Sequence, residues 1–264
     1  ASDVYKRQEV AFNSYPAAVM PDFKALRYIT CPNHAISDSK NHHPGIDNRG
    51  PFLSMNPFSS RCCQHNHAQG WPYFTEHLVL ATPDNGVATA IYAACKATVK
   101  VGDGKEITLH EETNYPFEEG IAFTVSTDEK VAFPFYLRIP SWTQKAEVRV
   151  NGKKVSAAPV AGKYLCINRE WANGDRVELT LPMSLSMRTW QVNKNSVSVD
   201  YGPLTLSLKI AEKYVEKDSR ETAIGDSKWQ KGADPQKWPT TEIYPDSPWN
   251  YSCLLYTSPS PRDR

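Results

Sequence analysis

Two adjacent cysteines, Cys62 and Cys63, are the residues of this sequence with the clearest chemical potential. They lie in the run RCCQHNHAQGWPYF, which also contains His65 and His67. Neighbouring cysteines do not readily form a disulfide with each other, because their Cα atoms are only about 3.8 Å apart. Thiolates are strong nucleophiles and soft metal ligands, and a bound zinc ion deprotonates a coordinating thiol. The pair therefore indicates a nucleophilic or metal-bound cysteine site.

Two other interpretations of this run remain open. The thiols could pack as small apolar groups while the histidines face water. The four donors could also form a zinc site by themselves, although known zinc sites place more residues between their ligand pairs. We therefore expect further metal ligands to come from other parts of the protein.

Both ends of the sequence resemble translated sequencing adapter. Residues 3–8 (DVYKRQ) and 253–258 (CLLYTS) are encoded by an adapter and nearly its reverse complement, and residues 259–263 continue the second one. We expect residues 1–8 and 253–264 to be artefacts of this kind and exclude them from reasoning about the fold. The chain is then predicted to be a fragment of a longer protein, called the parent below.

Composition excludes several classes of function. The two end segments carry four basic and two acidic residues, so their removal changes the formal charge from +1 to −1. This balance gives no electrostatic basis for binding nucleic acid or an anionic membrane. No apolar run has the length of a membrane span. The five cysteines outside the end segments lack the spacing of a disulfide framework, which indicates free or metal-bound thiols.

The segments that would position the cysteine pair have little regular periodicity. Residues 19–29 are compatible with a short helix, and residues 37–52, which include His42, His43 and Asp47, have the turn residues of a long loop. Apolar residues at helical spacing predict a helix over residues 71–82. We assign no role to these two histidines or to Asp47.

After Gly86 the pattern changes from helical spacing to alternation. Short alternating or apolar runs between residues 87 and 181, with Asn151-Gly152 as a hairpin turn, predict a β-sandwich over residues 83–185. Residues 186–252 read as the start of a second β domain, charged and irregular beyond Ala211. The predicted fold is mainly β with a helical N-terminal part.

These motifs occur in an order that resembles glycoside hydrolase family 127, whose members are of the β-L-arabinofuranosidase type. The motifs that support this resemblance are RCCQHN with its Asn66, GWPYFTEHL, ATPDNGVATAIYA, FYLRIPSW, VRVNGK, WANGDRVELTLPM and DYGPLTLSL. The resemblance covers residues 9–252. It implies that residues 9–82 are the C-terminal end of an (α/α)6 catalytic barrel followed by β-sandwich domains.

The resemblance also implies a mechanism. Cys62 would be the nucleophile of a retaining glycosidase, and Cys62 and Cys63 would both bind zinc. The remaining ligands in that family, a Glu-x-Cys pair, and the acid/base glutamate lie upstream. Here Glu9 is the only glutamate before Cys62, and no glutamate stands two residues before Cys31. We therefore expect half of a metal site and an inactive fragment.

Two alternatives from other classes remain. One is a noncatalytic carbohydrate-binding or spacer module, which does not account for the cysteine pair. The other is a thiol hydrolase in which His65 or His67 is the base for Cys62, although catalytic Cys and His residues usually come from distant positions.

For the glycosidase, the resemblance implies a plant-type glycan substrate with a non-reducing-end β-L-arabinofuranoside or a related furanoside. The sequence leaves the sugar linkage, the oligomeric state and the bacterial compartment, cytoplasmic or periplasmic, unassigned.

Overall fold

The structure is a computed structural model that describes residues 2–30, 34–40, 42, 54–59, 62–222 and 229–249. It consists of two compact units. Unit 1 combines Ala1–Ser14 with Trp71–Leu206, and unit 2 combines Tyr15–Gly70 with Ser207–Arg264. Each unit is therefore assembled from segments that are far apart in the sequence.

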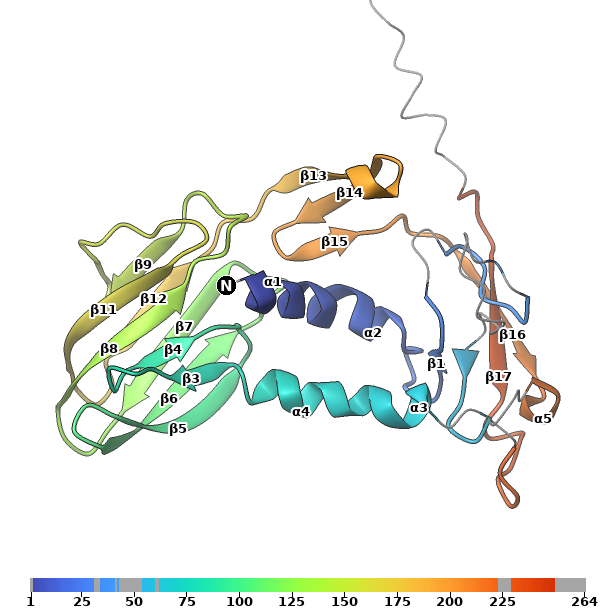
Figure 1. The fold of residues 1–264 in the computed structure, drawn as a ribbon, viewed down its shortest axis with the longest axis horizontal. Helices are drawn as coiled ribbons and strands as arrows, with labels where there is room; N and C mark the ends of the chain where they lie inside the picture. Colours follow the sequence, from blue (N-terminus) through green and yellow to red (C-terminus); the bar gives the residue numbers. More distant parts are fainter. Residues whose placement is uncertain are drawn as a thin grey trace, which may run out of the picture. The chain divides into compact units, whose positions relative to one another are not determined.

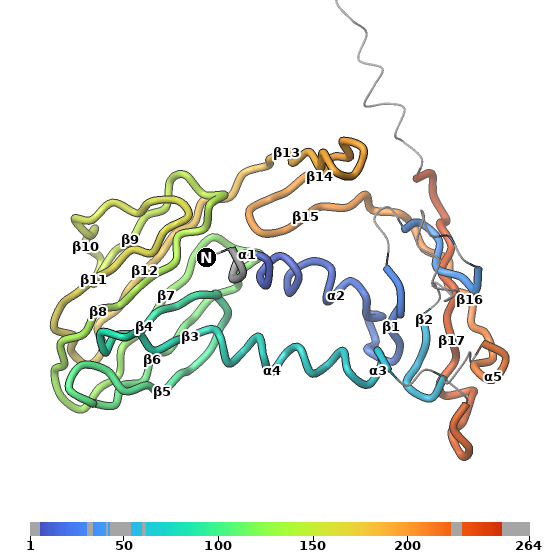
Figure 2. Tube along the Cα trace, viewed as in Figure 1, coloured from blue at the N-terminus to red at the C-terminus, as the bar shows by residue number. Residues whose placement is uncertain are grey.

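Unit 1 contains two large sheets (Figures 1 and 2). Most of their strands lie where alternating or apolar runs in the sequence predict strands. A six-stranded sheet has the order β10-β9-β12-β7-β6-β5, and a four-stranded sheet has the order β11-β8-β4-β3. All neighbouring strands are antiparallel except β4 and β8. The strands are β3 (Val79–Ala81), β4 (Val87–Thr89), β5 (Cys95–Val101), β6 (Lys105–Thr113), β7 (Gly120–Ser126), β8 (Val131–Arg138), β9 (Glu147–Val150), β10 (Lys153–Lys154), β11 (Tyr164–Trp171) and β12 (Arg176–Thr180).

The larger of two apolar clusters takes residues from both sheets. In β7, Ile121, Phe123 and Val125 are buried while the intervening residues are not, which is the pattern of a strand with one face on a core. Trp171 is fully buried, and its indole N–H donates to the Phe133 carbonyl at 3.0 Å. Trp171 therefore belongs to the core.

A helical segment and a small third sheet complete unit 1. The helical segment comprises α1 (Ser2–Glu9), the π-helix η1 (Val10–Ser14) and most of α4 (Gly70–Thr75). Phe12 packs edge-on against Phe74 and Tyr115. The third sheet has the order β13-β14-β15, with β13 (Leu185–Trp190), the 3-10 helix η3 (Gln191–Asn193), β14 (Ser196–Tyr201) and β15 (Leu204–Leu206).

Unit 2 is built on a four-stranded antiparallel sheet with the order β1-β2-β17-β16. Its strands are β1 (Leu26–Arg27), β2 (Ser54–Met55), β16 (Glu212–Lys217) and β17 (Thr240–Pro245). Its helices are α2 (Tyr15–Ala17), α3 (Cys63–Asn66), the 3-10 helix η2 (His67–Gln69) and α5 (Ser219–Thr222). The pairing of Ser54 with Thr241 joins its two sequence segments.

The structure corrects three local predictions. Residues 19–29 are not helical, because Val19 pairs with Leu26 across a turn. The predicted helix over residues 71–82 ends at Thr75, since Val79–Ala81 pairs with Val87–Thr89 instead. The region beyond Ala211 contains two regular strands, β16 and β17.

The predicted fold class, mainly β with a helical N-terminal part, is confirmed. The predicted domain boundaries after residues 8, 82, 185 and 252 remain a prediction. None of the described helices has both the length and the apolar character needed to cross a bilayer.

Candidate active site

The cysteine pair lies in unit 2, at the start of the short helix α3. Cys62 directly precedes the helix and is exposed, whereas Cys63 is its first residue and is half-buried. Neither cysteine is in a disulfide, and their sulfur atoms lie 3.9 Å apart. The two thiols are therefore adjacent in space as well as in sequence.

The sulfur spacing fits two thiolates on one zinc ion. Two sulfurs bound tetrahedrally at about 2.3 Å from zinc are about 3.8 Å apart, close to the observed separation of 3.9 Å. Within the described part of the chain, no third His, Cys, Asp or Glu joins them to form a metal-binding group. The pair thus fits half of a tetrahedral site.

The environment of Cys63 favours the neutral thiol. Burial raises the pKa of Cys63, and its hydrogen bond to Cys62 and the charge of a Cys62 thiolate raise it further. A nucleophilic or ligating thiolate at this position therefore needs a nearby positive charge.

Backbone hydrogen bonds fix the position of Cys62. Its carbonyl accepts from the backbone N–H of Asn66 at 3.0 Å and from the Asn66 side-chain amide at 2.8 Å. The Gln64 side chain donates to the Leu26 carbonyl in β1 at 3.3 Å, which ties α3 to the sheet of unit 2. Asn66 therefore holds the backbone at Cys62 through two hydrogen bonds.

Both neighbouring histidines are engaged with backbone carbonyls. His65 Nε2 lies 3.1 Å from the Pro57 carbonyl, and His67 Nε2 lies 3.0 Å from the Tyr15 carbonyl. The His67 ring also stacks on Tyr15, with ring centroids 3.9 Å apart. A carbonyl requires a protonated nitrogen as its partner, so neither Nε2 is available as a base for Cys62.

The other candidate residues that the structure describes, His42 and Glu9, have partners other than the cysteine pair. His42 Nε2 lies 2.7 Å from Asp38 Oδ1. Glu9, the only glutamate before Cys62, forms an ion pair with Arg188 in unit 1. Cys31, His43 and Asp47 lie outside the described residues.

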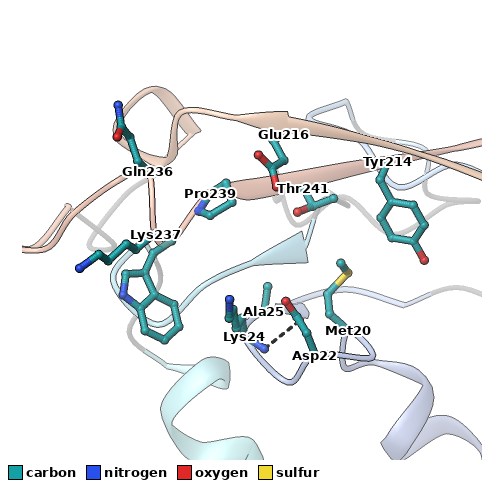
Figure 3. A pocket seen from close by; sticks show the side chains of 11 residues that line it. Met20, Asp22, Lys24, Ala25, Tyr214, Glu216, Gln236, Lys237, Pro239 and Thr241 are labelled. Carbon is teal, nitrogen blue, oxygen red and sulfur yellow. Dashed lines mark hydrogen bonds between the residues drawn. The ribbon is translucent and has the colours of Figure 1, made fainter.

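Unit 2 also contains a cavity of about 630 Å³ that the sequence reasoning missed (Figure 3). Tyr214, Glu216 and Thr241 from β16 and β17 line one side. Met20 and Asp22 lie opposite them, and the Asp22 carboxylate accepts from the Lys24 backbone N–H at 3.1 Å. The sequence signal that could have found part of this cavity is a strand at residues 212–217, because such a strand places Tyr214 and Glu216 on the same face. The cysteine pair does not line this cavity.

Two family profiles match the chain. Residues 3–76 match the β-L-arabinofuranosidase GH127 catalytic domain, and residues 86–183 match the β-L-arabinofuranosidase GH127 middle domain. Together the two matches cover more than half of the chain and include both the cysteine pair and the β-sandwich. No curated protein gives a significant match.

Solved structures with the same fold include three glycosidases. One, described as a glycoside hydrolase, is 26% identical with a TM-score of 0.63, over 80% of this chain and 34% of its own. A GH127 β-L-arabinofuranosidase from Geobacillus stearothermophilus T6 is 21% identical with a TM-score of 0.64. The match covers 91% of this chain and 44% of that structure's chain. A GH127 β-arabinofuranosidase is 20% identical with a TM-score of 0.60, and the match covers 92% of this chain and 43% of that structure's chain. The chain therefore spans less than half the length of each of these structures.

Proposed function

Because the chain belongs to glycoside hydrolase family 127, we propose that its parent is a retaining glycosidase that uses Cys62 as its nucleophile. The observation that carries this proposal is the exposed Cys62 thiol with the Cys63 sulfur 3.9 Å away. The proposed substrate is a glycan with a non-reducing-end β-L-arabinofuranoside or a related furanoside. The names of the similar structures support this substrate class.

In the first step, the Cys62 thiolate attacks the anomeric carbon of the furanoside. A carbon–sulfur bond forms while the bond between the anomeric carbon and the leaving-group oxygen breaks, and that oxygen takes a proton from an acid outside this chain. In the second step, water attacks the same carbon while the conjugate base of that acid takes a proton from the water, the carbon–sulfur bond breaks, and the thiolate returns. Two inversions give net retention of configuration.

Cys62 and Cys63 would hold a zinc ion together with ligands from the parent. When bound, zinc supplies the positive charge that keeps thiols ionised at neutral pH. This role matches the raised pKa of the Cys63 thiol, which would otherwise stay protonated. The hydrogen bonds that the Asn66 backbone N–H and side-chain amide donate to the Cys62 carbonyl would keep Cys62 in place during attack.

Substitution of Cys62 in the parent tests the nucleophile. The natural gene would first be recovered by sequencing outward from residues 9 and 252. We expect Cys62→Ser to lower release of a chromogenic arabinofuranoside aglycone at least about 1000-fold, because the reacting atom is lost. Cys166→Ser is the matched control, since Cys166 is also exposed and unbridged but lies on β11. Undiminished turnover by Cys62→Ser would remove the assignment.

A noncatalytic carbohydrate-binding module is the alternative function. It predicts that the parent binds the same glycan without releasing sugar, and that Cys62→Ser leaves the binding affinity unchanged. Measuring binding and turnover on the same preparation separates the two proposals.

A further inference from the structure

The helical turns that follow the cysteine pair are attached to Tyr15 of α2. The His67 ring stacks on the Tyr15 ring, with centroids 3.9 Å apart and planes 10° apart. His67 Nε2 donates to the Tyr15 carbonyl at 3.0 Å, and the Gly70 backbone N–H donates to the Tyr15 hydroxyl at 3.1 Å. The ring, the carbonyl and the hydroxyl of one tyrosine thus hold the chain at both ends of η2.

Close packing of the Tyr15 ring explains why residue 70 is a glycine. A Cβ at Gly70 would lie 2.3 Å from the Tyr15 hydroxyl oxygen and 2.7 Å from the ring carbon that carries it. Non-bonded carbon atoms pack best at about 3.5 to 4.0 Å, so no larger residue fits there without moving the ring. Gly70 has ordinary helical angles, with φ −68° and ψ −29°, so the backbone does not require a glycine.

Hydrogen bonds connect η2 to both cysteines. The His67 backbone N–H donates to the Cys63 carbonyl at the end of α3. The Gln69 side-chain amide donates to Asn66 Oδ1 at 3.1 Å, and the Asn66 side-chain amide donates to the Cys62 carbonyl at 2.8 Å. The position of η2 therefore affects the backbone of Cys62 and of Cys63.

We propose that Tyr15 is a positioning residue for the cysteine pair, which it keeps in place for zinc binding through η2. The helix α3 has 4 residues and η2 has 3, and helices this short are not stable without outside contacts. Ligands that are ordered before the metal arrives lose less entropy when it binds. This proposal rests on the proposed function, because it assigns Tyr15 to the same zinc site.

The zinc affinity of the parent, measured by competition with a chromogenic chelator, tests this role. Tyr15→Ala removes both side-chain contacts and should weaken zinc binding about 10- to 100-fold, as loss of an outer-shell partner does. Tyr15→Phe keeps the ring stack and loses one hydrogen bond, so it should weaken binding about fivefold or less. Tyr73→Ala is the matched control and should bind zinc as the wild type does, since the Tyr73 side chain is 66% exposed on α4. Unchanged affinity of Tyr15→Ala would overturn the proposal.

Gly70→Ala tests the same contact without changing the tyrosine. The added Cβ would push the Tyr15 ring away from His67, so zinc affinity should fall as it does in Tyr15→Ala. In the variant that carries both substitutions the new Cβ meets no ring, so the second substitution should cause no further loss. Additive losses would show that Gly70→Ala acts elsewhere, and they would overturn the proposal.

Amide hydrogen exchange in the metal-free 264-residue chain gives a readout that needs neither zinc nor turnover. Tyr15→Ala should accelerate exchange in the peptide that spans residues 63–69 at least about fivefold and leave β7 unchanged. Unchanged exchange at residues 63–69, or equal acceleration in β7, would overturn the proposal. A wild-type parent that binds no zinc would overturn the proposed zinc site together with this role. A zinc-binding parent in which Tyr15→Ala keeps its affinity would overturn this role alone.

Discussion

At the level of single residues, the chemistry of the site depends on how two sulfurs are charged. Cys62 and Cys63 are held 3.9 Å apart at the start of α3, and burial raises the pKa of Cys63. Two anionic sulfurs at this distance repel each other unless a cation lies between them. The pair therefore fits the zinc site proposed for the parent.

This gives a prediction for alkylation of the metal-free chain. A raised thiol pKa keeps Cys63 neutral through neutral pH, so its reaction with iodoacetamide should accelerate only above the pH at which an ordinary thiol ionises. The rate at Cys63, followed by peptide mapping between pH 6 and about pH 11, is compared with N-acetylcysteine. A midpoint at or below that of N-acetylcysteine would contradict the account.

At the level of elements, the pairing of β5 with β6 buries a carboxyl group. Glu111 is opposite Cys95, accepts from the Ala93 backbone N–H at 3.1 Å and lies 3.8 Å from the Cys95 sulfur. Burial raises the pKa of Glu111 to about 8. The folded state thus holds a proton that the unfolded chain loses near pH 4.5.

The sign of the resulting pH effect follows from this difference. Because the folded pKa lies above the unfolded one, the folded state is destabilised as pH rises from about 4.5 to about 8. Glu111→Gln should remove this loss and raise the free energy of unfolding at pH 8.5 by at least about 2 kcal/mol, with little change at pH 4. Urea titrations at the two pH values measure it. An equal effect of the substitution at both would contradict the assigned burial.

The turn between β9 and β10 offers a test of the backbone. Asn151 and Gly152 both have positive φ, at 50° and 76°, and a Cβ at Gly152 would meet no atom within 4 Å. Gly152→Ala should therefore cost about 1 kcal/mol of unfolding free energy from backbone strain alone. Gly120→Ala is the control, since Gly120 has equal space without a positive φ, and it should change stability by less than about 0.5 kcal/mol. Equal costs for the two variants in urea titrations would refute this.

The sequence predicted an element correctly where the local signal was strong, and wrongly where a distant strand changed the local structure. Strong local signals, such as the alternation in β7 and the Asn151-Gly152 turn, identified their elements. The spacing of Trp71, Phe74 and Leu78 fits a helix, but pairing with Val87–Thr89 turns the end of that run into β3. Tertiary pairing overrides local periodicity where a strand partner is close.

At the level of the whole molecule, the sequence could not reveal long-range assembly. β16 has the charged sequence EKYVEK and became a strand only through pairing with β17, which itself pairs with Ser54 near the other end of the chain. The division into units that join distant segments was likewise not predictable. The cysteine pair could be identified because adjacency in sequence guarantees adjacency in space. The remaining zinc ligands and the acid of the proposed mechanism are expected upstream in the parent, and this stays a prediction.

The most direct test of the account is to locate the sugar during turnover. The parent is mixed with a slowly hydrolysed arabinofuranoside, quenched in acid within milliseconds, digested and mapped by mass spectrometry. A pentosyl adduct is expected on the peptide that contains Cys62, absent from Cys62→Ser and present in Cys166→Ser. A pentosyl adduct on a peptide carrying an aspartate or glutamate nucleophile, with Cys62 unmodified, would contradict it.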